Sequence, residues 1–277
     1  MKNVTYTECI YLFDIRQVHD SDDVSTVSSS AILTNLVSLG ASVTDIERIQ
    51  KYHVREDRLR TAVGELILRK NLQSDGPIVI NRADPVTGNP VKPYVVSPHL
   101  GQFNISHDSD LVAVAIVRPS VCVGIDVMKV QIPNGRSQYE FLSLMRDVFT
   151  EKEWTYIAPN GGIESLRRFY RLWTAKEAYL KCIGTGLYVE PRAIEVILLD
   201  QTESILRYEA SISGIPDDNI RLLIFEDVFV DYIVAVCISS TWNRHPHLVG
   251  RRSGTCKTDQ LTILREFIFH HVHLESI

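Results

Sequence analysis

The sequence has few features that would tie the protein to a membrane, to secretion or to nucleic acid. None of its apolar runs reaches the ~18 residues of a membrane-spanning helix. The N-terminus, MKNVTYTECIYLFDI, has neither an uninterrupted apolar stretch nor a small-residue cleavage site, so we expect no signal peptide. Lys and Arg number 29 against 34 Asp and Glu, a net charge of −5. That balance argues against a protein held to nucleic acid by broad electrostatic attraction.

Cysteine is scarce, and no two cysteines are close enough to form a CxxC metal or redox pair. An odd, scattered set is typical of reduced thiols inside the cell. We therefore expect a soluble cytoplasmic protein with no membrane or nucleic-acid partner, and we also expect it to be a monomer. The five cysteines are Cys9, Cys122, Cys182, Cys237 and Cys256.

Several motifs that carry well-known chemistry are also missing. The sequence has no GxxxxGK[ST] and no GxGxxG that opens a helix, which excludes the standard phosphate-binding loops. It has no GxSxG and no HExxH, which excludes the common serine-hydrolase and zinc-protease sites. A phosphate or metal site must therefore be built from dispersed residues.

The chain is nevertheless long and apolar enough for a large core, with 277 residues of which 45% are hydrophobic. Periodicity predicts an α+β protein. We expect helices near 30–39, after Ser42, and at 57–72, 137–148, 151–157, 164–183 and 258–271. We expect strands at 9–15, 111–117, 121–127, 193–199, 205–212, 220–228 and 231–239, with a hairpin-like break between the second and third.

Two faint internal similarities suggest a duplicated plan. DLVAVAIV (110–117) is similar to DYIVAVCI (231–238), and RTAVGELILRK (60–70) is similar to WTAKEAYLKC (173–182). One interpretation is that any two strands or helices look this alike. The other is two related α/β halves with a ligand site in the cleft between them.

The predicted helix over 164–183, which Gly184 ends, carries charge on its apolar face. At about 100° per residue, Lys176 lies in the middle of that face, with Glu177 and Lys181 just off its edge. One interpretation is an i,i+4 ion pair between Glu177 and Lys181, worth about 0.3–0.5 kcal/mol. The other is a ligand site, because a lysine centred on a packing face often points at an anion.

A second candidate is VGIDVMK (123–129), where Asp126 interrupts an apolar strand after Gly124. A carboxylate there is costly unless it is paired or bound to a cation. Asp126 is either a strand-end residue in a turn or a ligand of a hard cation. Mg²⁺ typically takes one or two carboxylates together with substrate phosphates, and Asp126 with Glu177 would supply such a pair.

Two further sets of residues lie in the first part of the chain. FNISHD (103–108) is either a polar turn or a phosphate-binding element in which His107 donates. The basic residues are either solvated surface or a pocket for a multiply phosphorylated ligand. They are Arg55, Arg58, Arg60, Arg82 and Lys92.

In this order, these motifs resemble the 4′-phosphopantetheinyl transferase superfamily, in its single-chain Sfp-like branch, which includes the eukaryotic aminoadipate-semialdehyde dehydrogenase type. The family patterns GxDxx and F-x-x-x-W-x-x-K-E-x-x-x-K are similar to GIDVM (124–128) and to the series Phe169, Trp173, Lys176, Glu177 and Lys181. Three other elements resemble the family: NISHD (104–108), VFTEKEW (148–154) with Glu153 in the acidic place, and REDRLRTAVGELILR (55–69).

The resemblance implies two pseudo-symmetric α/β halves that bind coenzyme A at their interface. Residues 1–118 would hold the 3′-phosphate and adenine side, residues 119–240 the Mg²⁺ and pyrophosphate side, and 241–277 would be a C-terminal tail. The protein would transfer the 4′-phosphopantetheine arm of coenzyme A to a serine of an apo carrier protein, releasing 3′,5′-ADP. The carrier would belong to an aminoadipate reductase, a fatty-acid synthase, or a polyketide or non-ribosomal peptide synthetase.

The family also implies residue roles. Asp126 and Glu177 would bind Mg²⁺, Glu177 would take the serine proton, and Lys181 would pair with a phosphate oxygen. Trp173 and Lys176 would set the helix against the sheet and orient Glu177. Coenzyme A would be bound by Arg60, Arg82, Lys92, Ser106, His107 and Lys181.

Two departures from the family pattern matter. Met128 stands where many bacterial members have an acid, so water is expected to complete the metal shell. Asn89 replaces the lysine of the family's G-K-P, so either Lys92 or Arg82 compensates or the 3′-phosphate contact is weaker. Asn89 also motivates the alternative of a degenerate module that binds coenzyme A or carrier protein without chemistry. A third option is another Mg²⁺-dependent nucleotide enzyme, such as a phosphoesterase.

Overall fold

The computed structural model describes residues 8–19, 22, 24–72, 76–133, 135–158, 161–184, 189–201, 205–212, 215–216, 219–226, 228–239 and 268–271. These residues divide into two compact units. The first runs to Val123 and also takes in the C-terminal strand, and the second runs from Gly124 to Thr241. The expected division after residues 118 and 240 into a coenzyme A side, a Mg²⁺ side and a tail stays a prediction. Among the described residues, no helix combines the length and apolar character that crossing a membrane would require.

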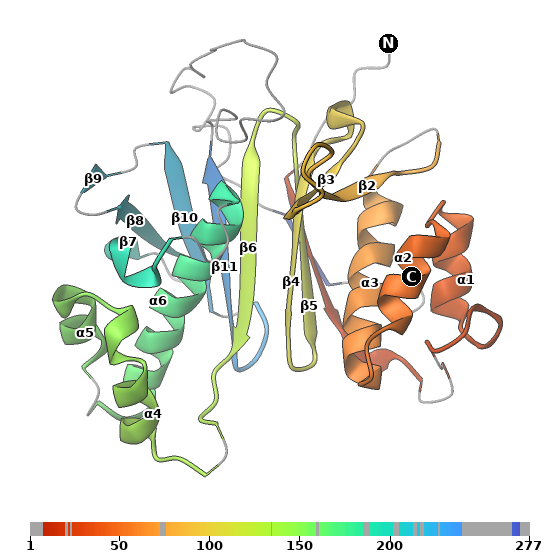
Figure 1. Ribbon diagram of the computed structural model, residues 1–277. Helices are drawn as coiled ribbons and strands as arrows, with labels where there is room; N and C mark the ends of the chain where they lie inside the picture. Colours follow the sequence, from red (N-terminus) through yellow and green to blue (C-terminus); the bar gives the residue numbers. More distant parts are fainter. Residues whose placement is uncertain are drawn as a thin grey trace. The chain divides into compact units, whose positions relative to one another are not determined.

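The first unit contains a four-stranded sheet in the order β12-β1-β5-β4 (Figure 1). β1 (Cys9–Asp14) pairs in parallel with β12 (Ile268–His271), and β5 (Leu111–Val117) is antiparallel to both β1 and β4 (Gln102–Asp108). A separate two-stranded hairpin is formed by β2 (Ile80–Ala83) and β3 (Pro90–Val95).

Three helices accompany this sheet: α1 (Ala31–Ser38), α2 (Val43–Gln50) and α3 (Arg55–Asn71). The start of α2 follows the sequence prediction, because Ser42 and Asp45 form a reciprocal capping box. α3 packs closely on the sheet, since a Cβ added to Gly64 would lie 3.0 Å from Cγ2 of Ile105. The apolar core lies between these helices and the sheet, with Leu59, Leu66 and Val112 at most 1% exposed.

The second unit contains a sheet in the order β6-β11-β10-β8-β7, with β9 paired to β8. Figure 1 shows α6 lying along this sheet. The strands are β6 (Cys122–Lys129), β7 (Ile194–Gln201), β8 (Ile205–Ile212), β9 (Ile215–Pro216), β10 (Ile220–Phe225) and β11 (Tyr232–Ser239). The helices are α4 (Gln138–Leu144), α5 (Glu151–Ile157) and α6 (Gly162–Ile183).

α6 ends where the sequence predicts, because Gly184 adopts φ = 73° and its N–H bonds to the carbonyl of Leu180. Short 3₁₀ turns connect other elements. They are η1 (Ile15–Gln17), η2 (Val27–Ser29), η3 (Pro98–Leu100), η4 (Arg146–Val148) and η6 (Pro191–Ala193).

Three local predictions are wrong. β5 and β6 do not form a hairpin, because both edges of β5 are taken by β1 and β4, and β6 pairs with β11 in the other sheet. Residues 103–108 are part of strand β4 rather than a turn, because β5 pairs with them along their whole length. The end of the expected helix 258–271 is a strand, since residues 268–271 pair with β1; the rest of that helix lies outside the described residues.

Candidate active site

The candidate site of the second unit forms where β6 passes beneath α6. A Cβ added to Gly124 would lie 2.0 Å from the carbonyl oxygen of Ala178 and 2.4 Å from the amide nitrogen of Cys182. Only glycine allows so close an approach of strand and helix. Because alternate residues of a strand share a face, Asp126 points to the same side as Gly124, toward α6.

Asp126 is buried, with 4% of its surface exposed. Its Oδ1 accepts a hydrogen bond from Nζ of Lys181 at 2.6 Å, and the lysine side chain is 30% exposed. This ion pair offsets the desolvation of the carboxylate. Lys181 is therefore ion-paired, but with a residue 55 positions away rather than with Glu177 one turn back on the same helix.

Glu177 is half-buried on α6, and among the described residues its carboxylate accepts no hydrogen bond. Burial raises the pKa of Glu177, and the negative charge of Asp126 raises it further, against the opposing effect of Lys181. Asp126 and Glu177 are thus close enough to repel each other. The three side chains form an unbalanced group of two carboxylates and one ammonium.

Such a group fits a magnesium ion. A divalent cation would stabilise the charged form of Glu177, which is half-buried beside another negative charge, and carboxylate oxygens are the ligands that Mg²⁺ prefers. Within the described part of the chain, no set of three or more His, Cys, Asp or Glu side chains could hold a metal. The side chain of Met128 has no oxygen atom. A metal at this site would therefore have two side-chain ligands from the protein, Asp126 and Glu177.

Lys176, whose role the sequence leaves open, is a structural residue. Its side chain is 1% exposed, and its Nζ donates to Oε2 of Glu153 at 2.8 Å and to the carbonyl of Ile194 at 2.7 Å. It also donates to the carbonyls of Val148 and Pro191. Burial lowers the pKa of Lys176, although the charge of Glu153 favours its protonated form. The anion expected opposite this lysine is therefore the protein's own Glu153.

Glu153 extends this network to the sheet, since its Oε1 accepts the backbone N–H of Val196 on β7 at 2.8 Å. Its Oε2 also accepts the N–H of Thr150 and caps α5. One turn before Lys176 on α6, Trp173 stacks on Phe169, with ring centroids 6.3 Å apart and an interplanar angle of 11°. These contacts fix α6, and hence Glu177, relative to α5 and the sheet.

In the first unit, three candidate coenzyme A ligands already have protein partners. Arg60, with 15% of its side chain exposed, donates to the carbonyl of Ser109 and pairs with Asp57. Lys92 donates to the carbonyl of Val123 at 2.6 Å. These contacts anchor the turn between β4 and β5 and the start of β6.

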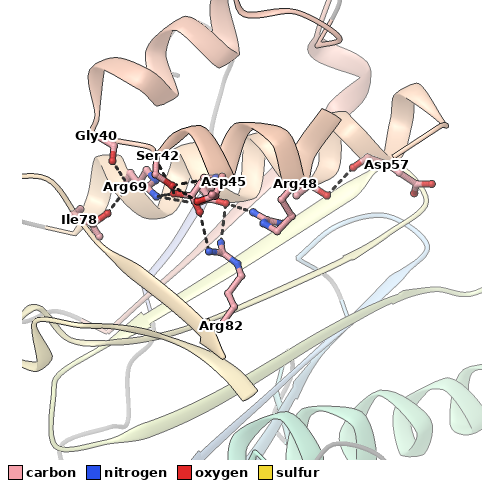
Figure 2. Close-up of polar contacts among 11 residues, drawn as sticks. Gly40, Ser42, Asp45, Arg48, Asp57, Arg69, Ile78 and Arg82 are labelled. Carbon is pink, nitrogen blue, oxygen red and sulfur yellow. Dashed lines mark hydrogen bonds and ion pairs between the residues drawn. The ribbon is translucent and has the colours of Figure 1, made fainter. Parts of the chain in front are cut away.

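The third, Arg82, belongs to a cluster of five charged side chains, which we call the arginine cluster (Figure 2). Nη1 of Arg82 donates to Asp45 and its Nη2 donates to Glu65, at 3.1 and 2.9 Å. Arg69, with a fully buried side chain, bridges the same two carboxylates, and Arg48 binds Glu65.

Three guanidinium groups against two carboxylates leave the arginine cluster with one excess positive charge. Arg48 and Arg82 keep 32% and 27% of their side chains exposed. Arg48 is not among the residues predicted from the sequence, because a single basic residue on an amphipathic helix carries no motif.

The remaining candidates lie on β4. Ser106 is buried with 5% exposure, and the neighbouring His107 is exposed, as alternation along a strand requires. The hairpin loop that carries Asn89 is held by Asp84, whose N–H donates to the Asn89 carbonyl at 2.8 Å. Asn89 itself is exposed, and neither Lys92 nor Arg82 stands free to replace the missing lysine.

The structure therefore brings together Asp126, Glu177 and Lys181 in the second unit. Arg60, Arg82, Lys92, Ser106 and His107 all lie in the first unit, which is described by itself. Within that unit, Arg82 lies beside Arg48, while Ser106 and His107 are consecutive on β4.

Comparison with known proteins points to one family. The model of the 4′-phosphopantetheinyl transferase superfamily matches residues 122–237, the segment that holds Asp126, Glu177 and Lys181. A "Phosphopantetheinyl transferase" of Thraustochytrium sp. is 38% identical over 160 residues, 53% of this chain and 54% of the relative. The "L-aminoadipate-semialdehyde dehydrogenase-phosphopantetheinyl transferase" of Xenopus laevis is 31% identical over 191 residues, 67% of this chain and 63% of the relative.

The chain thus spans about half to two thirds of the length of the curated relatives that it matches. The solved "Chronobacterium ammoniagenes ACPS-CoA complex" covers 43% of this chain at 20% identity, with a TM-score of 0.29 that is too low to show a shared whole-chain fold. The family model and the curated relatives agree on the identity. Residues 122–237 of this chain belong to the 4′-phosphopantetheinyl transferase superfamily.

Proposed function

We propose that this protein transfers the 4′-phosphopantetheine arm of coenzyme A to a serine of apo carrier-protein domains, in a magnesium-dependent reaction. The observation that carries the proposal is the convergence of Asp126, Glu177 and Lys181 at the crossing of β6 and α6. The match of residues 122–237 to the superfamily and the curated relatives' names support the same reaction class.

In the proposed reaction, the serine oxygen forms a bond to the β-phosphorus of coenzyme A. The bond from that phosphorus to the bridging oxygen breaks, and 3′,5′-ADP leaves with the electron pair. Glu177 accepts the serine proton, directly or through a water molecule. Its half-buried place beside Asp126 puts a carboxylate at the site that can take up this proton.

Asp126 and Glu177 would hold the magnesium ion. When bound, the ion would neutralise charge on the pyrophosphate and on the developing transition state. Lys181, partly exposed at the same site, would donate to a phosphate oxygen.

The first unit would bind the remainder of coenzyme A. The excess positive charge of the arginine cluster, with Arg48 and Arg82 partly exposed, supports a role in holding phosphate. Arg60, Lys92, Ser106 and His107 remain proposed ligands. Arg60 and Lys92 each donate to a backbone carbonyl at present. To bind coenzyme A, each would either donate to a phosphate as well or give up its carbonyl partner for the phosphate.

The test is incubation of the full chain with coenzyme A, Mg²⁺ and a panel of apo carrier proteins, followed by intact-mass measurement of each carrier. The proposal predicts the mass gain of one phosphopantetheine arm on at least one carrier, together with 3′,5′-ADP. No gain on any carrier would contradict it. Tight coenzyme A binding without transfer would instead identify a binding module.

A further inference from the structure

The position of Lys181 raises a question about how a metal reaches the site. Its ammonium lies 2.6 Å from Oδ1 of Asp126, the carboxylate proposed as a metal ligand. The same lysine is the proposed partner of a coenzyme A phosphate. An ammonium has three N–H donors, so the phosphate contact alone does not require Lys181 to leave Asp126, but a cation bound to Asp126 would repel the ammonium.

Charge repulsion disfavours a metal ion and the Lys181 ammonium on Asp126 at the same time. Without a metal, Asp126, Glu177 and Lys181 sum to one negative charge. If a divalent cation joined them while Lys181 stayed on Asp126, the site would carry one positive charge and an ammonium would lie against the metal. The negative charges of the coenzyme A pyrophosphate offset this excess positive charge and offer Lys181 another anionic partner.

Geometry permits such a change of partner. The Lys181 side chain is 30% exposed, whereas the Asp126 side chain is only 6% exposed and lies on a strand that the helix crosses at backbone contact. The lysine has the flexible, partly solvated side chain, and the carboxylate is fixed. When a ligand enters, Lys181 is the member of the pair that can move.

Resting on the proposed function, we propose that Lys181 is a built-in counter-ion that occupies the metal's place on Asp126 and moves to a phosphate when coenzyme A binds. Metal and coenzyme A then favour each other's binding. Coenzyme A draws Lys181 away from Asp126 and so frees the carboxylate for the metal, and the metal in turn frees Lys181 to bind a phosphate. By thermodynamic linkage the enhancement is reciprocal. The free protein accordingly binds metal weakly, and the complete site assembles only with the donor substrate.

The experiment measures Mn²⁺ binding by electron paramagnetic resonance, with and without coenzyme A, in wild type and in Lys181→Met. We expect Lys181→Met to bind Mn²⁺ at least about fivefold more tightly than wild type without coenzyme A, the lower end of typical couplings between sites. We also expect coenzyme A to enhance Mn²⁺ binding less in the variant than in wild type.

A matched control separates displacement from the general effect of removing a positive charge. Lys129 lies on the same strand as Asp126, with its ammonium over the ring of Tyr232 at 5.8 Å from the centroid. Lys129→Met removes an equal charge without touching the Asp126–Lys181 pair. If Lys129→Met tightens Mn²⁺ binding as much as Lys181→Met does, or if neither does, the proposal is wrong.

A second measurement follows the lysine directly. The ¹⁵Nζ resonance of Lys181, identified from its loss in Lys181→Arg, should show a protected ammonium in the free protein. We expect it to change on addition of Mg²⁺ with coenzyme A. An unchanged Lys181 signal under saturating Mg²⁺ and coenzyme A would show that the pair persists and would overturn the displacement.

Asp126→Asn distinguishes failure of this inference from failure of the proposed metal site. If Asp126→Asn binds Mn²⁺ like wild type, the metal assignment itself fails and the displacement fails with it. If Asp126→Asn loses Mn²⁺ binding while Lys181→Met gains none, only the counter-ion role is refuted. The carrier-protein transfer assay tests the function independently of both.

Discussion

Lys176 and Glu153 form an ion pair in which both side chains are 1% exposed and Nζ lies 2.8 Å from Oε2. The pair connects α6 to α5 directly, and it reaches β7 through Ile194 and Val196. Since Glu177 follows Lys176 in the sequence, the pair also sets the rotation of the helix that carries the candidate base.

Lys176→Met should be strongly destabilising, because it leaves the Glu153 carboxylate buried without its counter-ion. Breaking a buried pair in this way costs about 3–5 kcal/mol. Urea unfolding followed by circular dichroism measures the free energy of unfolding. The double variant Lys176→Met with Glu153→Gln removes both charges and should be less destabilised than the single variant. A single variant as stable as wild type would show that the pair contributes little to the fold.

Gly124→Ala should destabilise the second unit and displace Asp126 from Lys181. The added methyl group would meet backbone atoms of α6 at 2.0 and 2.4 Å, and backbone cannot move aside as a side-chain end can. Overpacking a core typically costs about 1–3 kcal/mol. We expect Gly124→Ala to lower the free energy of unfolding by about 3 kcal/mol or more, because the added methyl group meets backbone atoms.

Gly76→Ala is the matched control for this change, because a Cβ at Gly76 has no neighbour within 4 Å. The control should leave the melting temperature close to that of wild type. Equal melting temperatures for Gly124→Ala and Gly76→Ala would contradict the close crossing of β6 and α6.

Asp126→Asn should reduce transfer to a carrier protein by at least about a hundredfold, because an amide oxygen lacks the charge that holds a divalent cation. The shape of the side chain is preserved and its charge is removed, so the protein should still fold. Initial rates over a range of Mg²⁺ concentrations measure the effect. Full activity in a folded Asp126→Asn protein would refute the metal assignment.

The arginine cluster should make stability depend on pH at the acidic end. Burial alone would raise the pKa of Asp45, but hydrogen bonds from Ser42 and the charges of Arg69 and Arg82 outweigh it, so the pKa is lowered. A carboxyl with a lower pKa in the folded state stabilises the fold above its unfolded pKa of 3.8. That contribution is lost as the pH falls through the folded value.

Asp45→Asn removes this titration. The difference in the free energy of unfolding between wild type and Asp45→Asn should be largest near neutral pH and should shrink below about pH 4. Urea titrations over that range measure it. A difference that stays constant down to the acid limit would mean that the Asp45 charge does not stabilise the fold.

Much of the local structure follows from short-range rules in the sequence. The capping box of Ser42 and Asp45 starts α2, and Gly184 ends α6, because these features depend only on neighbouring backbone groups. The ordered motifs NISHD (104–108), GIDVM (124–128) and the series from Phe169 to Lys181 also indicate the family.

The tertiary structure alone decides which charges meet. Helical spacing favours a pair between Glu177 and Lys181, but the crossing at Gly124 brings Asp126 closer to the lysine. Lys176 looks like a ligand residue on the helix and is instead neutralised by Glu153. These outcomes depend on contacts between residues far apart in the chain, whose distances no local pattern sets. The same holds for β5 and β6, which are neighbours in sequence yet pair in different sheets, because strand partners depend on which edges remain free.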